Sequence, residues 1–206
     1  KLRKLEDVNG KEIYLKRKFR NTKDGKETEE IESMVSEDQV TLVKGEAGSG
    51  KSSIAVKIIQ EWAKEELLKD ITLCLFFSAG SDLKIPLQKL VWGNIEEVSA
   101  WKDDDFGEAF QNLQTLASQG KLAVVTDGLD EFGSMTKKTL NLASDAAMHV
   151  SSSIDVTTLC TGILARKVFP GAKVLATGRS TETIQAEILG GKGEIFDLVN
   201  LKDIDR

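Results

Sequence analysis

Histidine, cysteine and proline are all rare in this chain of 206 residues, which contains one histidine, two cysteines and two prolines. One histidine cannot supply a histidine-rich metal site, and two prolines exclude a collagen-like or proline-rich chain. The two cysteines, Cys74 and Cys160, are too few for a disulfide framework, and both lie in apolar segments where core packing is the expected role. A reducing, cytoplasmic setting is therefore expected.

Long hydrophobic runs are also missing. The longest, residues 71–77 with a single threonine, is far shorter than the roughly 18–20 apolar residues of a membrane-spanning helix. The sequence therefore predicts no contact with a membrane. Because the chain starts at Lys1 without a methionine and ends at Arg206 after a charged stretch, we expect it to be part of a longer protein.

The composition is that of a folded globular protein, with 40% hydrophobic residues, 30% charged residues and a net charge of −5. Basic residues are concentrated at the start, where residues 1–20 include eight Lys or Arg and three acidic residues. Such a segment is typical of an arm that binds nucleic acid or lipid, but no series of aromatic side chains accompanies the charge, which favours a solvated connector. Residues 20–38 are almost entirely polar, and we expect an exposed loop or short helix there.

From residue 39 onward, apolar strand patterns alternate with helical patterns. Strands are predicted at residues 40–43, 71–77, 122–126, 172–177 and 194–199. A helix is predicted after the first strand, and two more are predicted at residues 83–98 and 106–118. Residues 143–163 are interpreted as a helix, a loop and a second helix. Strands separated by helices pair in parallel through right-handed crossovers. The predicted fold class is therefore α/β, a three-layer sandwich with a mainly parallel sheet.

A glycine-rich segment, Gly45–Ser52, matches the pattern G-x-x-x-x-G-K-[ST] completely and lies between the first strand and the first helix. Its glycines allow backbone N–H groups to turn inward around phosphate oxygens, and the helix N-terminus adds its dipole. Lys51 can reach the β- and γ-phosphates, and Ser52 offers a hydroxyl ligand for Mg²⁺. The predicted nucleotide-binding residues are Gly45, Glu46, Ala47, Gly48, Ser49, Gly50, Lys51, Ser52 and Ser53.

Three acidic residues, Asp127, Asp130 and Glu131, follow the predicted strand at residues 122–126. A carboxylate at the carboxyl end of such a strand is the usual second protein ligand of Mg²⁺ in P-loop enzymes, so Asp127 is the predicted metal ligand alongside Ser52. Asp130 or Glu131 can accept the proton of an attacking water, or orient that water. The alternative for these two residues is a helix N-cap and a first-turn acid.

The position of Asp127 along the chain also bears on the reaction. Lys51 and Asp127 lie 76 residues apart, room for a complete strand that residues 71–77 supply, so we expect the P-loop strand and the strand before Asp127 (the Walker B strand) to be separated in the sheet. A separated Walker B strand with a glutamate just past the aspartate favours hydrolysis over transfer to an acceptor. The N-K-x-D signature of GTPases is missing, so adenine is the preferred base.

Arg179 follows the strand at residues 172–177 and is therefore expected at the same sheet edge. An arginine in this position can contact the γ-phosphate and report its presence. The alternative is a surface ion pair at a strand end.

Together these motifs resemble those of a NACHT domain, the NTPase module of NOD-like receptors within the STAND class of P-loop ATPases. The P-loop and residues 127–131 (DGLDE) match the family patterns completely, whereas residues 177–180 (TGRS) depart from a TSRP-like stretch at Gly178 and Ser180. Residues 11–15 resemble the short segment by which such proteins approach the P-loop domain. The resemblance implies a cytoplasmic ATP/ADP switch of innate immunity, ADP-bound at rest, that opens and oligomerises to activate a signalling partner.

The resemblance also suggests a division of the chain. Residues 1–38 would form a basic and polar N-terminal arm and connector, residues 39–200 the NACHT-type nucleotide-binding domain, and residues 201–206 the start of a following module. The family's helical and winged-helix modules, effector domain and ligand-sensing repeats would lie outside this chain. The implied activity is slow hydrolysis of ATP with Mg²⁺, and the implied partners are further copies of the full-length protein and a signalling effector.

Other functions also use a P-loop. A P-loop kinase needs a lid with several arginines, whereas Arg166 and Arg179 are the only arginines between residues 21 and 205. An AAA+-type nucleic-acid motor would use the basic arm and would show salt-dependent DNA binding. A scaffold that holds nucleotide permanently differs from the switch only in turnover.

Overall fold

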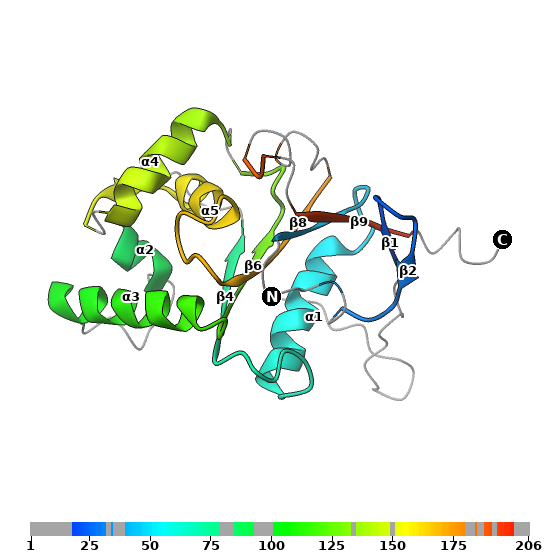
Figure 1. Ribbon diagram of the computed structural model, residues 1–206, viewed down its shortest axis with the longest axis horizontal. Coiled ribbons are helices and arrows are strands. Elements are labelled where there is room, and N and C mark those ends of the chain that lie inside the picture. Colours follow the sequence, from blue (N-terminus) through cyan, green and yellow to red (C-terminus); the bar gives the residue numbers. More distant parts are fainter. Residues whose placement is uncertain are drawn as a thin grey trace.

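A seven-stranded, mostly parallel sheet is the framework of the computed structural model (Figure 1). The structure describes residues 18–31, 34, 40–78, 85–92, 101–132, 135–148, 151–179, 184, 188–190 and 193–199. The strands of this sheet are β1 (Phe19–Asn21), β2 (Glu27–Thr28), β3 (Val40–Lys44), β4 (Leu73–Ser78), β6 (Leu122–Asp127), β8 (Lys173–Gly178) and β9 (Glu194–Leu198). Their order is β2-β1-β9-β3-β8-β6-β4, with β9, β3, β8, β6 and β4 parallel. The five strands predicted from the sequence are confirmed.

Helices lie on both sides of the sheet and complete the predicted three layers. α1 (Lys51–Ala63) lies on one side of the strands in Figure 1. The other side carries α2 (Leu87–Trp92), α3 (Asp103–Ser118), α4 (Lys137–Met148) and α5 (Val156–Leu164). A small second sheet pairs β5 (Ile85–Pro86) with β7 (Ser153–Ile154), just before α2 and α5.

Two hydrophobic clusters hold these layers together. On the α1 side, Ile58 packs in the same cluster as Val125 of β6. On the opposite side, Phe110 of α3 and Ile163 of α5 share a cluster with Val124, the preceding residue of β6. Successive side chains of a strand point to opposite faces, so a continuously apolar strand serves both clusters.

The helical predictions are confirmed in part. The helix predicted at residues 83–98 is shorter in the structure, because β5 occupies residues 85–86 and α2 ends at Trp92; residues 93–100 lie outside the described residues. α3 begins at Asp103, three residues before the predicted start, and Asp105 accepts a hydrogen bond from Lys102 N at 2.7 Å. Asp105 thus caps the first turn of the helix. Between α4 and α5, β7 lies in the predicted loop.

The N-terminal connector contributes strands to the sheet, which corrects the exposed loop or short helix expected for residues 20–38. β1 pairs antiparallel with β9 and with β2. Phe19 and Met34 are fully buried in the α1-side cluster. The polar composition concealed these strands because they lie at the margin of the sheet, where Arg20 and Glu27 pair in solvent. Residues 11–15 lie outside the described residues.

The strand order confirms that the P-loop strand and the Walker B strand are separated, but a different strand from the predicted one lies between them. The strand between β3, the P-loop strand, and β6, the Walker B strand, is β8. The strand predicted to separate them, residues 71–77, is β4, which lies beyond β6 at the edge of the sheet. The reason is the handedness of the crossovers. The connection through α1 carries the chain outward from β3 to β4, and the later helices lie on the opposite side, so the same handedness brings the chain back through β6 to β8.

Candidate nucleotide-binding site

The glycine-rich segment forms a tight turn between β3 and α1. Gly48 and Gly50 have φ values of 75° and 97°, and Ser49 N donates to Glu46 O at 3.2 Å. Gly50 is the N-cap residue of α1 and lies in the left-handed region, which residues with a Cβ adopt only with strain. The two glycines therefore let the chain enter α1 directly from the turn.

The base of the loop is closely packed. Gly45 N donates to Gly178 O of β8 at 3.2 Å, and a Cβ on Gly45 would lie 2.7 Å from Ser49 Oγ. Ser49 Oγ is buried and forms no hydrogen bond with any residue that the structure describes. Buried hydroxyls are nearly always paired, so an unmatched one fits a loop whose partner is a bound phosphate.

The first turn of α1 presents positive potential to the same loop. Among the described residues no side chain caps its N-terminus, and its first turn contains no acidic residue, which leaves N–H groups available to an anion. Lys51 Nζ donates to Gly45 O at 2.7 Å and to Glu46 O at 2.8 Å, so the ammonium lies on the loop itself. Ser52 and Ser53 follow it and are exposed. These residues fit a nucleotide's phosphates, with the Ser52 hydroxyl accessible to Mg²⁺.

Asp127 is the last residue of β6, at the same sheet edge as the P-loop. Its Oδ1 accepts a hydrogen bond of 2.5 Å from Thr177 Oγ1 on β8, the strand between the two motifs. Asp127 and Thr177 lie on the α1 face, because they follow Val125 and Leu175 of that cluster by two residues. The predicted metal ligand therefore faces the layer from which the P-loop lysine and serine come.

Two of the predicted catalytic residues, Asp130 and Arg179, form an ion pair. Arg179 Nε lies 3.0 Å from Asp130 Oδ2, and Arg179 N donates to Asp130 Oδ1 at 2.9 Å. The ion pair proposed as the alternative for Arg179 is thus present. The Arg179 side chain is 58% exposed, so its far end can still turn toward a ligand.

Glu131 lies beside this pair but is not part of it. Its side chain is exposed and folds over Gly128, where a Cβ would lie 3.7 Å from Glu131 Oε2. Neither Asp130 nor Glu131 begins a helix in the described residues, since α4 starts at Lys137. The N-cap alternative for these two acids is therefore wrong.

Thr177 is the site residue that sequence reasoning missed. It accepts a hydrogen bond from Gly128 N at 3.1 Å as well as donating to Asp127, and it is fully buried. A signal was available in the polar residues at the ends of the apolar strands. Ser78 and Asp127 are the last residues of β4 and β6 and pair in register, and Thr177 is the last but one residue of β8. Polar residues at the ends of neighbouring parallel strands meet at one edge.

The other reactive side chains have structural roles. Burial raises the pKa of the Cys74 thiol to about 12 and also raises the pKa of Cys160, so both remain protonated, as expected of packing residues. No group of three or more metal-ligating His, Cys, Asp or Glu side chains occurs in the described part of the chain. One hydroxyl and one carboxylate suffice for Mg²⁺, which takes its remaining ligands from phosphate and water. No described helix is both long enough and apolar enough to span a membrane.

The fold, the P-loop and the strand order define a P-loop NTPase. The family model of the NACHT domain matches residues 39–203. The chain therefore belongs to the NACHT domain family and is a nucleotide-binding domain.

Known relatives agree with this assignment. The chain is 25% identical over 147 residues to NACHT, LRR and PYD domains-containing protein 1a allele 5 of Rattus norvegicus, covering 69% of this chain and 11% of the relative. It is 27% identical over 171 residues to the 1b allele 5 protein of Mus musculus (76% and 13% covered) and 27% identical over 167 residues to Protein NLRC5 of Ictalurus punctatus (74% and 9% covered). The resemblance to NOD-like receptors is confirmed, and the chain spans about a tenth of the length of these relatives.

Proposed function

We propose that this chain is the ATP-binding, slowly ATP-hydrolysing switch domain of a NOD-like-receptor-type signalling protein, ADP-bound at rest and oligomerising on activation. The observation that carries the proposal is the meeting of the P-loop, Asp127 and Arg179 at one sheet edge in a NACHT family member. The proposal includes the division into an N-terminal arm (residues 1–38), a nucleotide-binding domain (39–200) and the start of a following module (201–206).

Each site residue has a proposed role. The P-loop N–H groups and Lys51 bind the phosphates, while Ser52 and Asp127 hold Mg²⁺. When bound, Mg²⁺ neutralises charge that develops on the β- and γ-phosphates. Glu131, whose carboxylate has no hydrogen-bond partner among the described residues, accepts a proton from the attacking water. Arg179 contacts the γ-phosphate.

The geometry around Asp130 supports slow turnover. Asp130 holds the Arg179 backbone N–H and guanidinium together, so it acts on Arg179 and leaves the base role to Glu131. Arg179 must give up part of this pair to reach a γ-phosphate. Glu131 is exposed to solvent, and a site that does not exclude water stabilises the transition state poorly.

The kinase alternative is not supported by the arginines. Arg166 Nη1 donates to Ala172 O at 3.1 Å, just before β8 begins, which places Arg166 at the sheet edge opposite the P-loop. Arg179 is then the only arginine at the site among the described residues, too few for a kinase lid.

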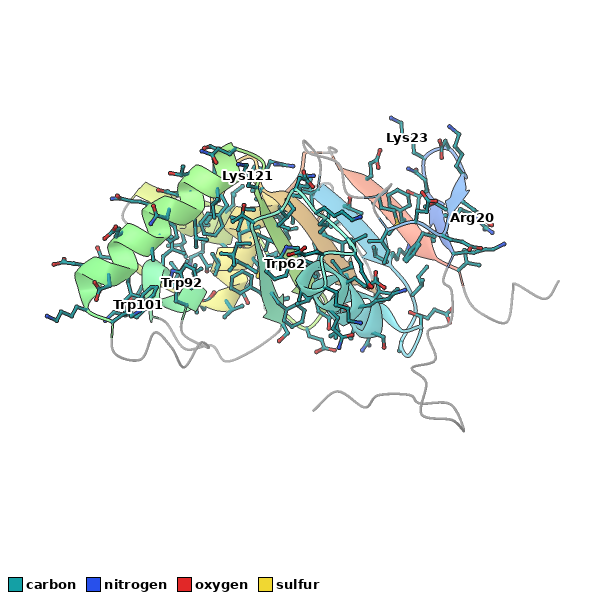
Figure 2. All side chains as sticks on the ribbon, turned by 90° about the horizontal axis from the view of Figure 1, so that it is seen from below. Arg20, Lys23, Trp62, Trp92, Trp101 and Lys121 are labelled. Atoms are coloured by element: carbon teal, nitrogen blue, oxygen red, sulfur yellow. The ribbon has the colours of Figure 1, made fainter. Side chains whose placement is uncertain are left out.

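The nucleic-acid motor is not supported by the arrangement of basic and aromatic side chains. Figure 2 shows Arg20 and Lys23 at one end of the molecule and Trp92 and Trp101 at the other. Arg20 also donates two hydrogen bonds to Glu27, at 2.8 and 3.1 Å. A single-stranded nucleic-acid site combines cations and stacking aromatics on one surface.

Mass spectrometry of nucleotide released from the purified protein tests the proposal most directly. ADP is the expected main species, and calorimetric titration should show tighter binding of ATP and ADP than of GTP. Hydrolysis should be slower than the roughly 1 s⁻¹ lower range of typical enzymes and should not respond to added DNA. The proposal is wrong if the folded protein neither contains nor binds adenine nucleotide, and DNA-stimulated hydrolysis would favour the motor.

The signalling part of the proposal needs the full-length protein. Light scattering after addition of ADP or a non-hydrolysable ATP analogue should show a larger assembly with the analogue only. A cytoplasmic location and a signalling effector bound through other domains belong to the same proposal. A monomer in both nucleotides would contradict the switch while leaving nucleotide binding intact.

A further inference from the structure

The Walker B turn, residues 127–131, is bound to the end of β8 by consecutive hydrogen bonds. Thr177 Oγ1 donates to Asp127 Oδ1 at 2.5 Å and accepts from Gly128 N at 3.1 Å. Thr177 O accepts from Leu129 N at 2.8 Å. One buried threonine therefore contacts three successive residues of the turn that contains the predicted metal ligand.

The chemistry of the groups determines the direction of these bonds. A backbone N–H can only donate, so the Thr177 hydroxyl oxygen accepts the hydrogen bond from the Gly128 N–H through one of its lone pairs. Its single proton is then donated to Asp127 Oδ1. Thr177 is 0% exposed and β-branched, so its χ1 rotation is restricted. The carboxylate of Asp127 is thereby held in one orientation. Its Oδ2 atom has no hydrogen-bond partner among the described residues.

We propose that Thr177 is a positioning residue for the metal: it binds Oδ1 of Asp127 so that Oδ2 is presented to the divalent cation that accompanies the nucleotide. This inference rests on the proposed function and assigns part of the metal affinity to β8, which contributes no metal ligand. Arg179 lies two residues further along the same strand end. The proposed metal ligand Asp127 and the proposed γ-phosphate contact Arg179 are therefore both held at the carboxyl end of β8.

The chain provides a matched control in Thr126. This threonine is also 0% exposed, belongs to the neighbouring strand β6, and its Oγ1 forms no hydrogen bond with any described residue. It precedes Asp127 and so points to the opposite face of the sheet. Replacing threonine by valine preserves the shape in both cases, but removes a hydrogen-bonded hydroxyl only at Thr177.

The test measures the affinity for ATP with excess Mg²⁺ and with EDTA, in wild type, Thr177→Val, Thr177→Ser and Thr126→Val. Mg²⁺ should tighten ATP binding to the wild type. The Mg²⁺ gain, the ratio of ATP affinity with Mg²⁺ to ATP affinity with EDTA, should fall by roughly 10-fold or more in Thr177→Val, the usual scale for removing a residue that orients a metal ligand. The ATP affinity measured with EDTA should be nearly unchanged. Thr177→Ser should restore the gain, and Thr126→Val should match the wild type.

The outcomes separate this inference from the proposed function. A folded Thr177→Val protein with the full Mg²⁺ gain would overturn the inference and leave the nucleotide site intact, and so would an equal loss with and without Mg²⁺. Failure of the wild type to bind ATP at all would instead overturn the proposed function. If Thr177→Val does not fold, Thr177→Cys keeps a side chain of similar size with a weaker donor. Its Mg²⁺ gain should be intermediate, and a gain equal to wild type would overturn the inference.

Discussion

The two edges of the parallel sheet are built for different purposes. At the carboxyl ends of β3, β6 and β8 lie a glycine turn, Lys51, Asp127 and the Asp130–Arg179 pair, all polar and several exposed. At the amino edge, Lys173 Nζ, with a side chain 8% exposed, pairs with Asp70 at 2.9 Å. The carboxyl edge carries the charges predicted to meet a ligand, whereas at the amino edge the buried Lys173 is paired with an exposed Asp70.

Backbone packing around glycine also differs between the two edges. Gly171, in the turn before β8, has a φ of 93°, and a Cβ there would lie 2.4 Å from Ala117 O at the end of α3. At the tip of the P-loop, by contrast, a Cβ on Gly48 would meet nothing within 4 Å, although the base of the loop at Gly45 is closely packed. Substitutions at the amino edge should therefore affect folding, and those at the carboxyl edge should affect the ligand.

The largest effect is expected for Gly171→Ala. Left-handed backbone strain and the clash with Ala117 O should together lower the free energy of unfolding by about 3–4 kcal/mol. Urea denaturation measures the loss. Gly120→Ala is the control, because Gly120 also has a positive φ of 68° but open space around it, and it should cost only about 1 kcal/mol. Equal losses at the two glycines would mean that strain alone accounts for the effect.

Lys51→Ala should act on the ligand and leave the fold unchanged. Loss of the only P-loop cation should weaken Mg·ATP binding by roughly 10²-fold, about 3 kcal/mol, while the free energy of unfolding changes little. Isothermal titration and thermal melting measure the two quantities. Lys57→Ala on the same helix is the control, since Lys57 pairs with Glu61 at 3.3 Å and should leave affinity unchanged. An unchanged Mg·ATP affinity in a folded Lys51→Ala protein would contradict the assignment of the P-loop to the nucleotide-binding site.

Glu131→Gln should retain ATP binding and slow hydrolysis by roughly 10²-fold, the usual scale for loss of a positioned base. Asp130→Asn should slow it less, by about 10-fold, because Asp130 acts through Arg179. Single-turnover hydrolysis compares the two proteins. If Asp130→Asn is the slower of the two, the roles of the two carboxylates are exchanged.

The smallest effect is expected at the amino edge, for Asp70→Asn. The hydrogen bond from Lys173 lowers the pKa of Asp70, and a carboxyl whose pKa is lower in the folded state stabilises the protein above its unfolded pKa. That contribution disappears as the pH falls through the folded value. Asp70→Asn should therefore cost about 1 kcal/mol or less at pH 7 and nothing well below about pH 4. Urea midpoints at both pH values check this, and a cost independent of pH would exclude the ion pair as its source.

Local signals in the sequence were sufficient to propose most of the candidate site. The P-loop is contiguous, so its glycines, Lys51 and Ser52 could be read directly. The position of Asp127 followed from the apolar strand before it. A surface ion pair appeared only as the alternative for Arg179, and its partner Asp130 was not predicted, because 49 residues separate the two in the chain.

The sequence by itself determined the α/β class, the five parallel strands and the glycine-rich loop predicted to bind phosphate, because periodicity and glycine spacing act over a few neighbouring residues. Only the tertiary structure decided that β8 lies between β3 and β6 and that Thr177 donates a hydrogen bond to Asp127. It also decided that the polar segment around Arg20 continues the sheet. Strand order depends on which side of the sheet each crossover helix lies, and hydrogen bonds between strands depend on register. Both are set by packing between segments distant in the chain, which no local pattern records.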